Sequence, residues 1–333
     1  MIKSNYHNKF IISDMSKQTA LVTGAAGFIG GHLLERLLAS QRYDAVGVDN
    51  MSNGHSELLP HEVSKQIIRS DFSAEMITAA LEHIDVVYHM AAVPRVSFSV
   101  ENPFETYVEN YHKTMILLDA IRQCKRKPRL VLASSSSVYG GEVSLPSKEN
   151  QAGLFTQASP YAMQKAQCEM ALRMYAKLYG VDCVALRFFN VFGPRQLGDS
   201  PYATAIAAWF AAHAAGKQAR SDGDGTQTRD MCYVSNVVDA CVLAGERAER
   251  FVGQSYNVGC GDRTSNNDIL QWFKKRYQSF EHVTAPTRAG DVMHTQADIE
   301  LTRSDLGYVP QVNIWQGLEL TAEWAEKNLK WSK

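Results

Sequence analysis

Tyr161 and Lys165 lie four residues apart in a segment that begins with Ser159 and Pro160. A serine followed by a proline is a typical helix start, so the pair is predicted to share one face of a helix. There the lysine cation would favour the phenolate and pull the tyrosine pKa toward neutral pH, which makes Tyr161 a candidate general base. Taken alone, the pair could equally be an exposed and inconsequential one.

A run of four serines, residues 134–137, follows the apolar segment 129–133. Serine runs are more typical of turns than of catalytic sites. Here, however, the run leaves a predicted strand at its carboxyl end, which is the edge where ligands of parallel sheets bind.

Gly24, Gly27 and Gly30 have the spacing Gly-x-x-Gly-x-x-Gly, between an apolar strand at 20–22 and a leucine-rich helix at 31–38. In a dinucleotide-binding turn the first glycine permits the tight turn, the second lets a pyrophosphate approach, and the third lets helix and strand pack closely. The spacing is one residue longer than Gly-x-Gly-x-x-Gly. A helix start that merely packs tightly is the alternative.

Strands and helices alternate around these residues. Apolar segments predict strands at 43–49, 66–69, 85–90 and 129–133, and apolar residues at helical spacing predict a helix over 104–122. The alanine-rich segment 203–215 also predicts a helix. This order predicts an α/β fold with a doubly wound parallel sheet.

Acidic residues end two of the predicted strands. Asp49 lies about 20 residues beyond the glycines, where a carboxylate can accept from ribose hydroxyls and repel a 2′-phosphate, so it favours NAD over NADP. An aspartate that stabilises a turn before Asn50 is the alternative. Asp71 could reach an adenine edge, and Ala91 and Ala92 leave room for a cofactor after the strand at 85–90.

Three segments, 23–30, 134–140 and 161–165, together resemble the extended short-chain dehydrogenase/reductase superfamily, in particular its nucleotide-sugar epimerase and dehydratase branch. The similarity runs from about Thr19 to Trp324. It implies a Rossmann domain that binds NAD at 18–188, with later segments returning to it, and a smaller domain at 189–333 that binds mainly the nucleotide sugar. It also implies a homodimer formed through a four-helix bundle.

The resemblance assigns roles residue by residue. The implied catalytic residues are Ser135, Tyr161 and Lys165. The residues implied to contact NAD are Gly24, Gly27, Phe28, Ile29, Gly30, Asp49, Asn50, Asp71, Phe72, Ala91, Ala92, Tyr161 and Lys165. The residues implied to contact the nucleotide sugar are Ser135, Ser136, Ser137, Asn190, Arg229, Arg288, Asp291 and Thr295. Arg229 and Arg288 would supply fork-shaped donors for the diphosphate.

The resemblance also implies how the reaction begins. Tyr161, assisted by Ser135, takes the proton from the sugar 4-hydroxyl while hydride leaves C4 for the nicotinamide. The dehydratases of the family then use an Asp-Glu pair, where this chain has Ser136 and Ser137, and the decarboxylases use a glutamate that is missing between 134 and 141. Return of the hydride to the other face, which is 4-epimerisation, is therefore predicted. A dehydratase, a glucuronate epimerase or decarboxylase, a net sugar dehydrogenase or reductase, and a non-catalytic NAD-binding scaffold stay open.

Thr295 occupies a position where galactose-specific epimerases of the family carry a bulky tyrosine. A small side chain there leaves room for a 2-acetamido group, which predicts activity on UDP-GlcNAc and UDP-GalNAc, with or without UDP-Glc and UDP-Gal. Uronic-acid epimerases can also have threonine here, so the substrate stays open.

The composition and charge of the chain exclude several other classes of function. The chain has 333 residues, 45% of them apolar, and a formal net charge of −1, which gives no electrostatic footprint for nucleic acid or an anionic membrane. It has no run of about 20 apolar residues that would span a bilayer, so a cytoplasmic protein is expected. The six cysteines show no zinc-ligand spacing, and no metal is expected. Residues 1–17 form a leader, predicted to be disordered or to follow an upstream start.

Overall fold

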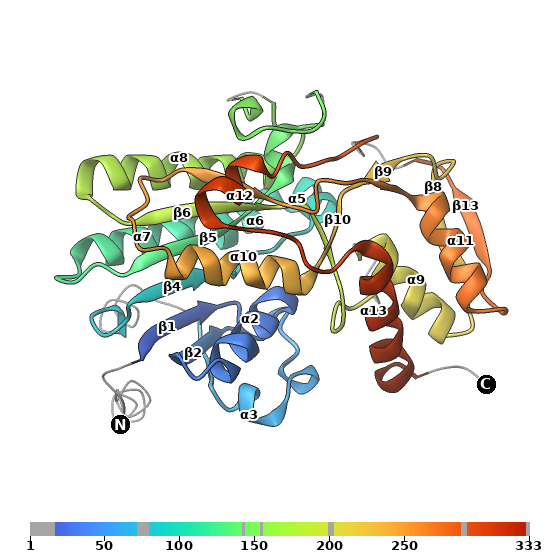
Figure 1. The fold of residues 1–333 in the computed structure, drawn as a ribbon, viewed down its shortest axis with the longest axis horizontal. Coiled ribbons are helices and arrows are strands. Elements are labelled where there is room, and N and C mark those ends of the chain that lie inside the picture. The colour runs from blue at the N-terminus through green and yellow to red at the C-terminus, as the bar shows by residue number, and fades with distance from the viewer. Residues whose placement is uncertain are drawn as a thin grey trace.

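The computed structural model describes residues 17–71, 80–141, 144–153, 156–198, 203–287 and 292–330. Figure 1 shows a central sheet between two groups of helices, with a smaller lobe beside it that contains α9, α11 and α13. Residues 1–16 of the predicted leader lie outside the described residues. No helix in the described part of the chain combines the length and apolar composition needed to cross a bilayer.

Seven strands form the central sheet, in the order β11, β6, β5, β4, β1, β2, β3, and all their pairings are parallel. The strands are β1 (Gln18–Thr23), β2 (Tyr43–Asp49), β3 (Ile67–Arg69), β4 (Val86–His89), β5 (Arg129–Ser135), β6 (Cys183–Phe188) and β11 (Ser255–Val258). The strand order reverses at β1, which has β2 on one side and β4 on the other. The predicted doubly wound parallel sheet is confirmed, and its switch point lies between β1 and β4.

Helices cover both faces of this sheet (Figure 1). On one face, α2 and α10 pack against each other and bury Leu33, Leu34 and Val237. On the other, α7 and α8 bury Leu117 and Leu172. The helices are α2 (Phe28–Ala39), α3 (His61–Ser64), α5 (Val96–Glu101), α6 (Pro103–Tyr107), α7 (Lys113–Gln123), α8 (Pro160–Tyr179), α9 (Ala205–Ala214), α10 (Val234–Glu246), α11 (Asn266–Arg276), α12 (Glu300–Leu306) and α13 (Ile314–Asn328).

The helix predicted over 104–122 is not uniform. A π-helical turn, Val108–His112, separates α6 from α7. Such turns are rare and occur frequently at functional sites. This one turns the buried Asn110 side chain toward Val93, whose N–H donates to Asn110 Oδ1 at 2.7 Å and whose carbonyl accepts from Nδ2 at 3.2 Å. The interruption therefore anchors the segment after β4.

The smaller lobe is built from short strand pairs and helices after residue 189. Its strands are β7 (Asn190–Phe192), β8 (Ala219–Asp222), β9 (Thr228–Arg229), β10 (Met231–Tyr233), β12 (Thr264–Ser265) and β13 (His282–Ala285). They pair as β7 with β10, β8 with β13 and β9 with β12. β11 is instead an edge strand of the central sheet, and α10 packs on that sheet, so the chain passes between the two parts more than once.

Candidate active site

The three glycines lie in the turn between β1 and α2. Gly24 has φ +69°, a conformation that side chains with a Cβ rarely adopt, and a Cβ there would lie 2.7 Å from the backbone of Ala91. A Cβ on Gly30 would lie 2.1 Å from the Gly24 carbonyl oxygen. Gly27 is the N-cap of α2 and offers no side-chain cap. The backbone N–H groups at this helix start are therefore suited to an anion such as a pyrophosphate.

A cavity of about 440 Å³ opens at this turn. All the predicted NAD contacts that the structure describes line it, while Phe72 lies outside the described residues. The Asp49 carboxylate, at the end of β2, accepts from the N–H groups of Ala26 at 2.9 Å and Met51 at 2.8 Å. Each of its oxygens keeps a further acceptor position, so the turn role and the ribose role are compatible.

Lys113 is a cavity residue that sequence reasoning missed. Its ammonium lies 2.8 Å from Asp71 and 2.8 Å from Glu109, so Asp71 is held by an ion pair in this structure. A lysine in the same helical segment as Glu109, four residues later, was the available signal.

Ser135, Tyr161 and Lys165 come together where β5 ends and α8 begins. The Ser159 side chain accepts from the Ala162 N–H at 3.2 Å and caps α8, as its sequence predicts. Tyr161 and Lys165 are both buried. The Lys165 ammonium donates to the Ala133 carbonyl at 2.7 Å and lies 5.8 Å from the centre of the Tyr161 ring. Ser135 and Tyr161 line both the dinucleotide cavity and a second cavity described below.

The lowering of the Tyr161 pKa that its spacing from Lys165 predicts is not found. Burial raises the pKa of Tyr161 to about 12, and only a hydrogen bond with Ser135 opposes it. Burial also lowers the pKa of Lys165. The physical reason is that the ammonium bonds a backbone carbonyl rather than the phenol, so only the Ser135 hydrogen bond offsets the desolvation of the phenolate. Burial therefore favours the protonated form of the Tyr161 phenol.

Ser134 lines the dinucleotide cavity, but its hydroxyl is directed into a buried charged network. Its hydroxyl donates to Glu169 at 2.6 Å, and Glu169 pairs with Arg187 at 2.7 Å. Arg187 also donates to the Tyr139 hydroxyl at 2.9 Å. Sequence reasoning missed this network, although an arginine within the apolar strand at 183–188 was a signal for it, because charges that are buried need partners.

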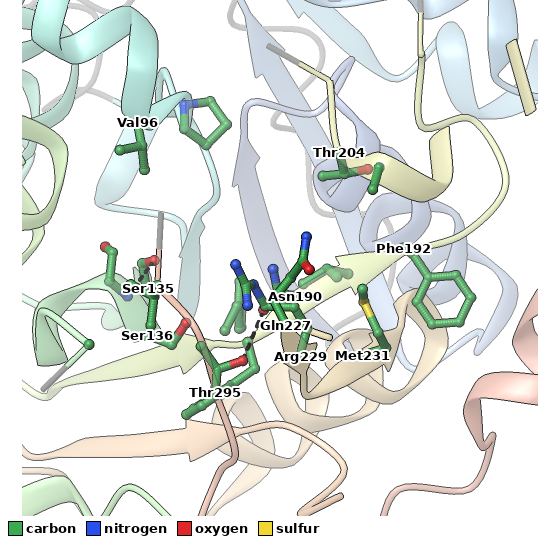
Figure 2. A pocket seen from close by; sticks show the side chains of 18 of the residues that line it. Val96, Ser135, Ser136, Asn190, Phe192, Thr204, Gln227, Arg229, Met231 and Thr295 are labelled. Atoms are coloured by element: carbon green, nitrogen blue, oxygen red, sulfur yellow. Dashed lines mark hydrogen bonds between the residues drawn. The ribbon is translucent and has the colours of Figure 1, made fainter. Parts of the chain in front are cut away.

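The second cavity, of about 610 Å³, lies between the sheet edge and the smaller lobe. It contains the described residues predicted to contact the nucleotide sugar: Ser135, Ser136, Ser137, Asn190, Arg229 and Thr295. Arg288 and Asp291 lie outside the described residues. In Figure 2 a dashed line joins the Thr295 hydroxyl to Asn190, an O–O distance of 3.3 Å. Thr295 Oγ1 also accepts from the Asp230 N–H at 3.1 Å.

Two details of this cavity bear on its chemistry. The Arg229 guanidinium donates to the carbonyls of Thr228 at 3.0 Å and Met293 at 3.1 Å, which fixes its direction. Among the described residues that line the cavity, Asp222 carries the single carboxylate, and it pairs with Arg220 at 2.7 Å. In the described chain no group of three His, Cys, Asp or Glu side chains could hold a metal ion.

Comparison with known proteins agrees with these features. The model of the NAD dependent epimerase/dehydratase family matches residues 20–259. A UDP-glucose 4-epimerase of Mycolicibacterium smegmatis is 35% identical over 311 residues, which cover 91% of this chain and 97% of that protein.

Two solved structures are similar over nearly the whole chain. One is a UDP-N-acetylglucosamine 4-epimerase of Methanobrevibacter ruminantium in complex with UDP-N-acetylmuramic acid, with a TM-score of 0.86, 31% identity, and coverage of 95% of this chain and 100% of that one. The other is a UDP-glucuronic acid 4-epimerase of Bacillus cereus with UDP-glucuronic acid and NAD. Its TM-score is 0.83 and its identity 32%, and the match covers 93% of this chain and 99% of that one.

Proposed function

Because the chain belongs to the NAD-dependent epimerase/dehydratase family, we propose that it interconverts the C4 epimers UDP-GlcNAc and UDP-GalNAc, with or without activity on UDP-Glc and UDP-Gal. The protein is an isomerase of the UDP-sugar 4-epimerase type, and its cofactor is NAD. The observation that carries the proposed reaction is the placement of Ser135 and Tyr161 on the wall shared by the two cavities. A proton-transfer group there can serve a sugar and a dinucleotide at the same point.

The residues present fit NAD, since Gly24, Gly27 and Gly30 line the dinucleotide cavity at the start of α2, and a Cβ at Gly24 or Gly30 would collide with the backbone that forms this turn. Bound NAD supplies the acceptor and donor for hydride transfer at the sugar C4. Tyr161 would remove the proton from the 4-hydroxyl and later return it, with Ser135 hydrogen-bonded to the same oxygen. Lys165 donates one of its three ammonium N–H groups to the Ala133 carbonyl, so the others can donate to the NAD ribose.

The cavity composition favours epimerisation over elimination or decarboxylation. Both of those reactions need a further acid or base near the keto sugar. At the two positions after Ser135 this chain has serines, and the one described carboxylate of the cavity is tied to Arg220. Transfer of the hydride back to the sugar needs no additional group.

A panel of UDP-sugars tests this proposal. The purified protein is incubated, without added NAD, with UDP-GlcNAc, UDP-Glc and UDP-glucuronate in separate reactions, and the C4 epimers are separated. Interconversion of UDP-GlcNAc and UDP-GalNAc is expected. A stable 4-keto product would indicate a dehydratase, released carbon dioxide a decarboxylase, and turnover of UDP-glucuronate alone a glucuronate epimerase, and each would contradict the proposed substrate or reaction.

Thr295→Tyr is expected to suppress turnover of the acetamido sugars while sparing UDP-Glc and UDP-Gal. The added ring would fill the space beside Asn190 in which a 2-acetamido group would lie. The ratio of kcat/KM values for the two sugar pairs is the measurement, and Thr295→Ser, which keeps the small hydroxyl side chain, is the matched control. Equal losses on both pairs would show that Thr295 does not set substrate size.

We further propose that the enzyme is a cytoplasmic homodimer that serves polysaccharide biosynthesis. A stripe of exposed apolar side chains follows α8, formed by Met163, Met170, Met174 and Leu178, with exposed fractions of 44%, 53%, 44% and 61%. Their spacing of seven, four and four places them on one helix face. Phe104 of α6 is 77% exposed. Two copies could cover these surfaces by forming a four-helix bundle from α8 and the α6–α7 segment.

The double substitution Met170→Glu/Leu178→Glu is expected to produce a monomer, because it would bury four carboxylates in the dimer contact without partners. Light scattering after gel filtration gives the mass. Arg173→Glu on the same helix is the control. The backbone of Arg173 packs against Gly253 of the same chain, and Arg173 does not belong to the stripe. A dimer that persists in the double variant would place the interface elsewhere.

A further inference from the structure

The segment 193–198, which we call the strap, follows β7 and lies against α2. Arg195 fixes it there: its guanidinium donates to Glu35 Oε2 at 2.7 Å and to His32 Nδ1 at 2.5 Å, and both partners belong to α2. Pro194 adds a third contact, since its carbonyl lies 2.9 Å from His32 Nε2. The Arg195 side chain is only 9% exposed.

His32 can make both contacts at once only as a neutral imidazole with its proton on Nε2. Burial first, and then the charge of Arg195, lower its pKa to about 4. At neutral pH the Nε2–H therefore donates to the Pro194 carbonyl, and Nδ1 accepts from Arg195. Both ring nitrogens of His32 therefore form hydrogen bonds with residues of the strap.

The backbone of Arg195 has φ +69°, in the left-handed region that favours glycine. A residue with a long side chain persists there only where its surroundings stabilise the conformation, and such positions cluster at ligand clamps. The next residue is also fixed, because Gln196 donates to the Val191 carbonyl at 3.0 Å and accepts from the Thr204 hydroxyl at 2.9 Å.

The strap forms part of the dinucleotide cavity. Arg195, Gln196 and Leu197 line the same cavity as Gly27 and Phe28. The ring of His32 contacts that of Phe28 edge to face, at 5.7 Å between centroids. The contacts that hold the strap therefore lie one turn of α2 beyond the residues predicted to meet the cofactor.

We propose that Arg195 is a positioning residue that latches the strap onto α2 and so retains NAD in its cavity between turnovers. The inference rests on the proposed use of NAD as a resident cofactor. The latch acts through His32 and Glu35, because Arg195 Nη2 carries two N–H donors and meets two acceptors on neighbouring turns of one helix.

Release of the cofactor from the intact protein tests the latch. The protein is loaded with NADH, mixed with excess NAD, and the loss of bound NADH fluorescence is followed in the absence of any sugar. Arg195→Met is expected to release NADH roughly 10- to 100-fold faster than the wild-type chain, since it loses two charge-assisted hydrogen bonds. His32→Ala/Glu35→Ala, which keeps Arg195 but removes its acceptors, is expected to shift release in the same direction and by a similar factor.

Arg36→Met is the matched control, because Arg36 is on the same helix but is exposed and pairs with Asp239. It is expected to leave release unchanged. Unchanged release in both latch variants would overturn the proposal. Fast release in Arg195→Met alone would also overturn it, because Arg195 would then act directly on the cofactor. A wild-type chain that retains NADH but turns over no UDP-sugar would contradict the proposed epimerase and leave the latch standing.

Discussion

Tyr161→Phe is expected to lower kcat for epimerisation by roughly 100- to 10,000-fold, the range that a positioned proton-transfer group contributes. The substitution removes one hydroxyl, whose partner is Ser135, and leaves the buried ring in place. The fold and the dinucleotide cavity should therefore be preserved. NAD content after purification, measured on the denatured protein, is expected to match that of the wild-type chain.

Tyr179→Phe provides the matched control, because Tyr179 lies at the far end of α8 and is 41% exposed. It is expected to keep wild-type kcat. If Tyr161→Phe retained a substantial rate, the proton would have to move through another group, and the proposed mechanism would be wrong.

Since the pKa of Tyr161 is raised to about 12 by burial, the wild-type rate should rise with pH wherever removal of the phenol proton limits turnover. That dependence should be lost in Tyr161→Phe.

Glu169→Ala is expected to lower the free energy of unfolding by about 3–5 kcal/mol, the cost of leaving one partner of a buried ion pair uncompensated. Arg187 is 2% exposed, and Glu169 accepts from its Nε at 2.9 Å and its Nη2 at 2.7 Å. The variant also leaves the buried Ser134 hydroxyl without its acceptor. Urea unfolding followed by circular dichroism gives the difference.

Glu62→Ala is the control for this pair, because Glu62 and Lys65 form an exposed ion pair of the kind that contributes less than about 1 kcal/mol. Glu169→Leu/Arg187→Met, which removes both charges, should recover much of the loss. A loss below about 1 kcal/mol in Glu169→Ala would mean that Tyr139 and the backbone compensate Arg187 by themselves.

The Glu169–Arg187 pair also predicts how the free energy of unfolding depends on pH. Burial alone would raise the pKa of Glu169, but the hydrogen bond and charge of Arg187 outweigh it, so the pKa is lowered below the ordinary glutamate value. A lowered folded-state pKa contributes stability above the unfolded-state pKa of about 4 and loses it as pH falls. The stability difference between the wild-type chain and Glu169→Gln should therefore shrink below about pH 4.

The Glu169–Arg187 pair also has a positional consequence for the site. It ties together β5, α8 and β6 through Ser134, Glu169 and Arg187. Because Ser134 is held in the network, its neighbour Ser135 is directed to the opposite side of the strand, toward Tyr161. Ser135 and α8, which carries Tyr161, are thus aligned by a buried charge pair that lines neither cavity.

The sequence by itself determined five of the seven strands of the central sheet, β1 to β5, but not β6 and β11. The strand predicted at 43–49 is β2, and the glycine turn lies between β1 and α2 as its spacing predicts. The Ser159 cap begins α8, which sets Tyr161 and Lys165 on one face. These features depend on local periodicity, glycine conformation and helix capping, which neighbouring residues specify.

Only the tertiary structure decided how distant residues meet. It directs Lys165 to the Ala133 carbonyl rather than to the phenol, and it joins Arg195 to His32 across 163 positions of sequence. It also inserts the π-helical turn that aims Asn110 at Val93. No periodicity encodes such contacts, because they arise when separately formed elements pack and their buried polar groups must find partners.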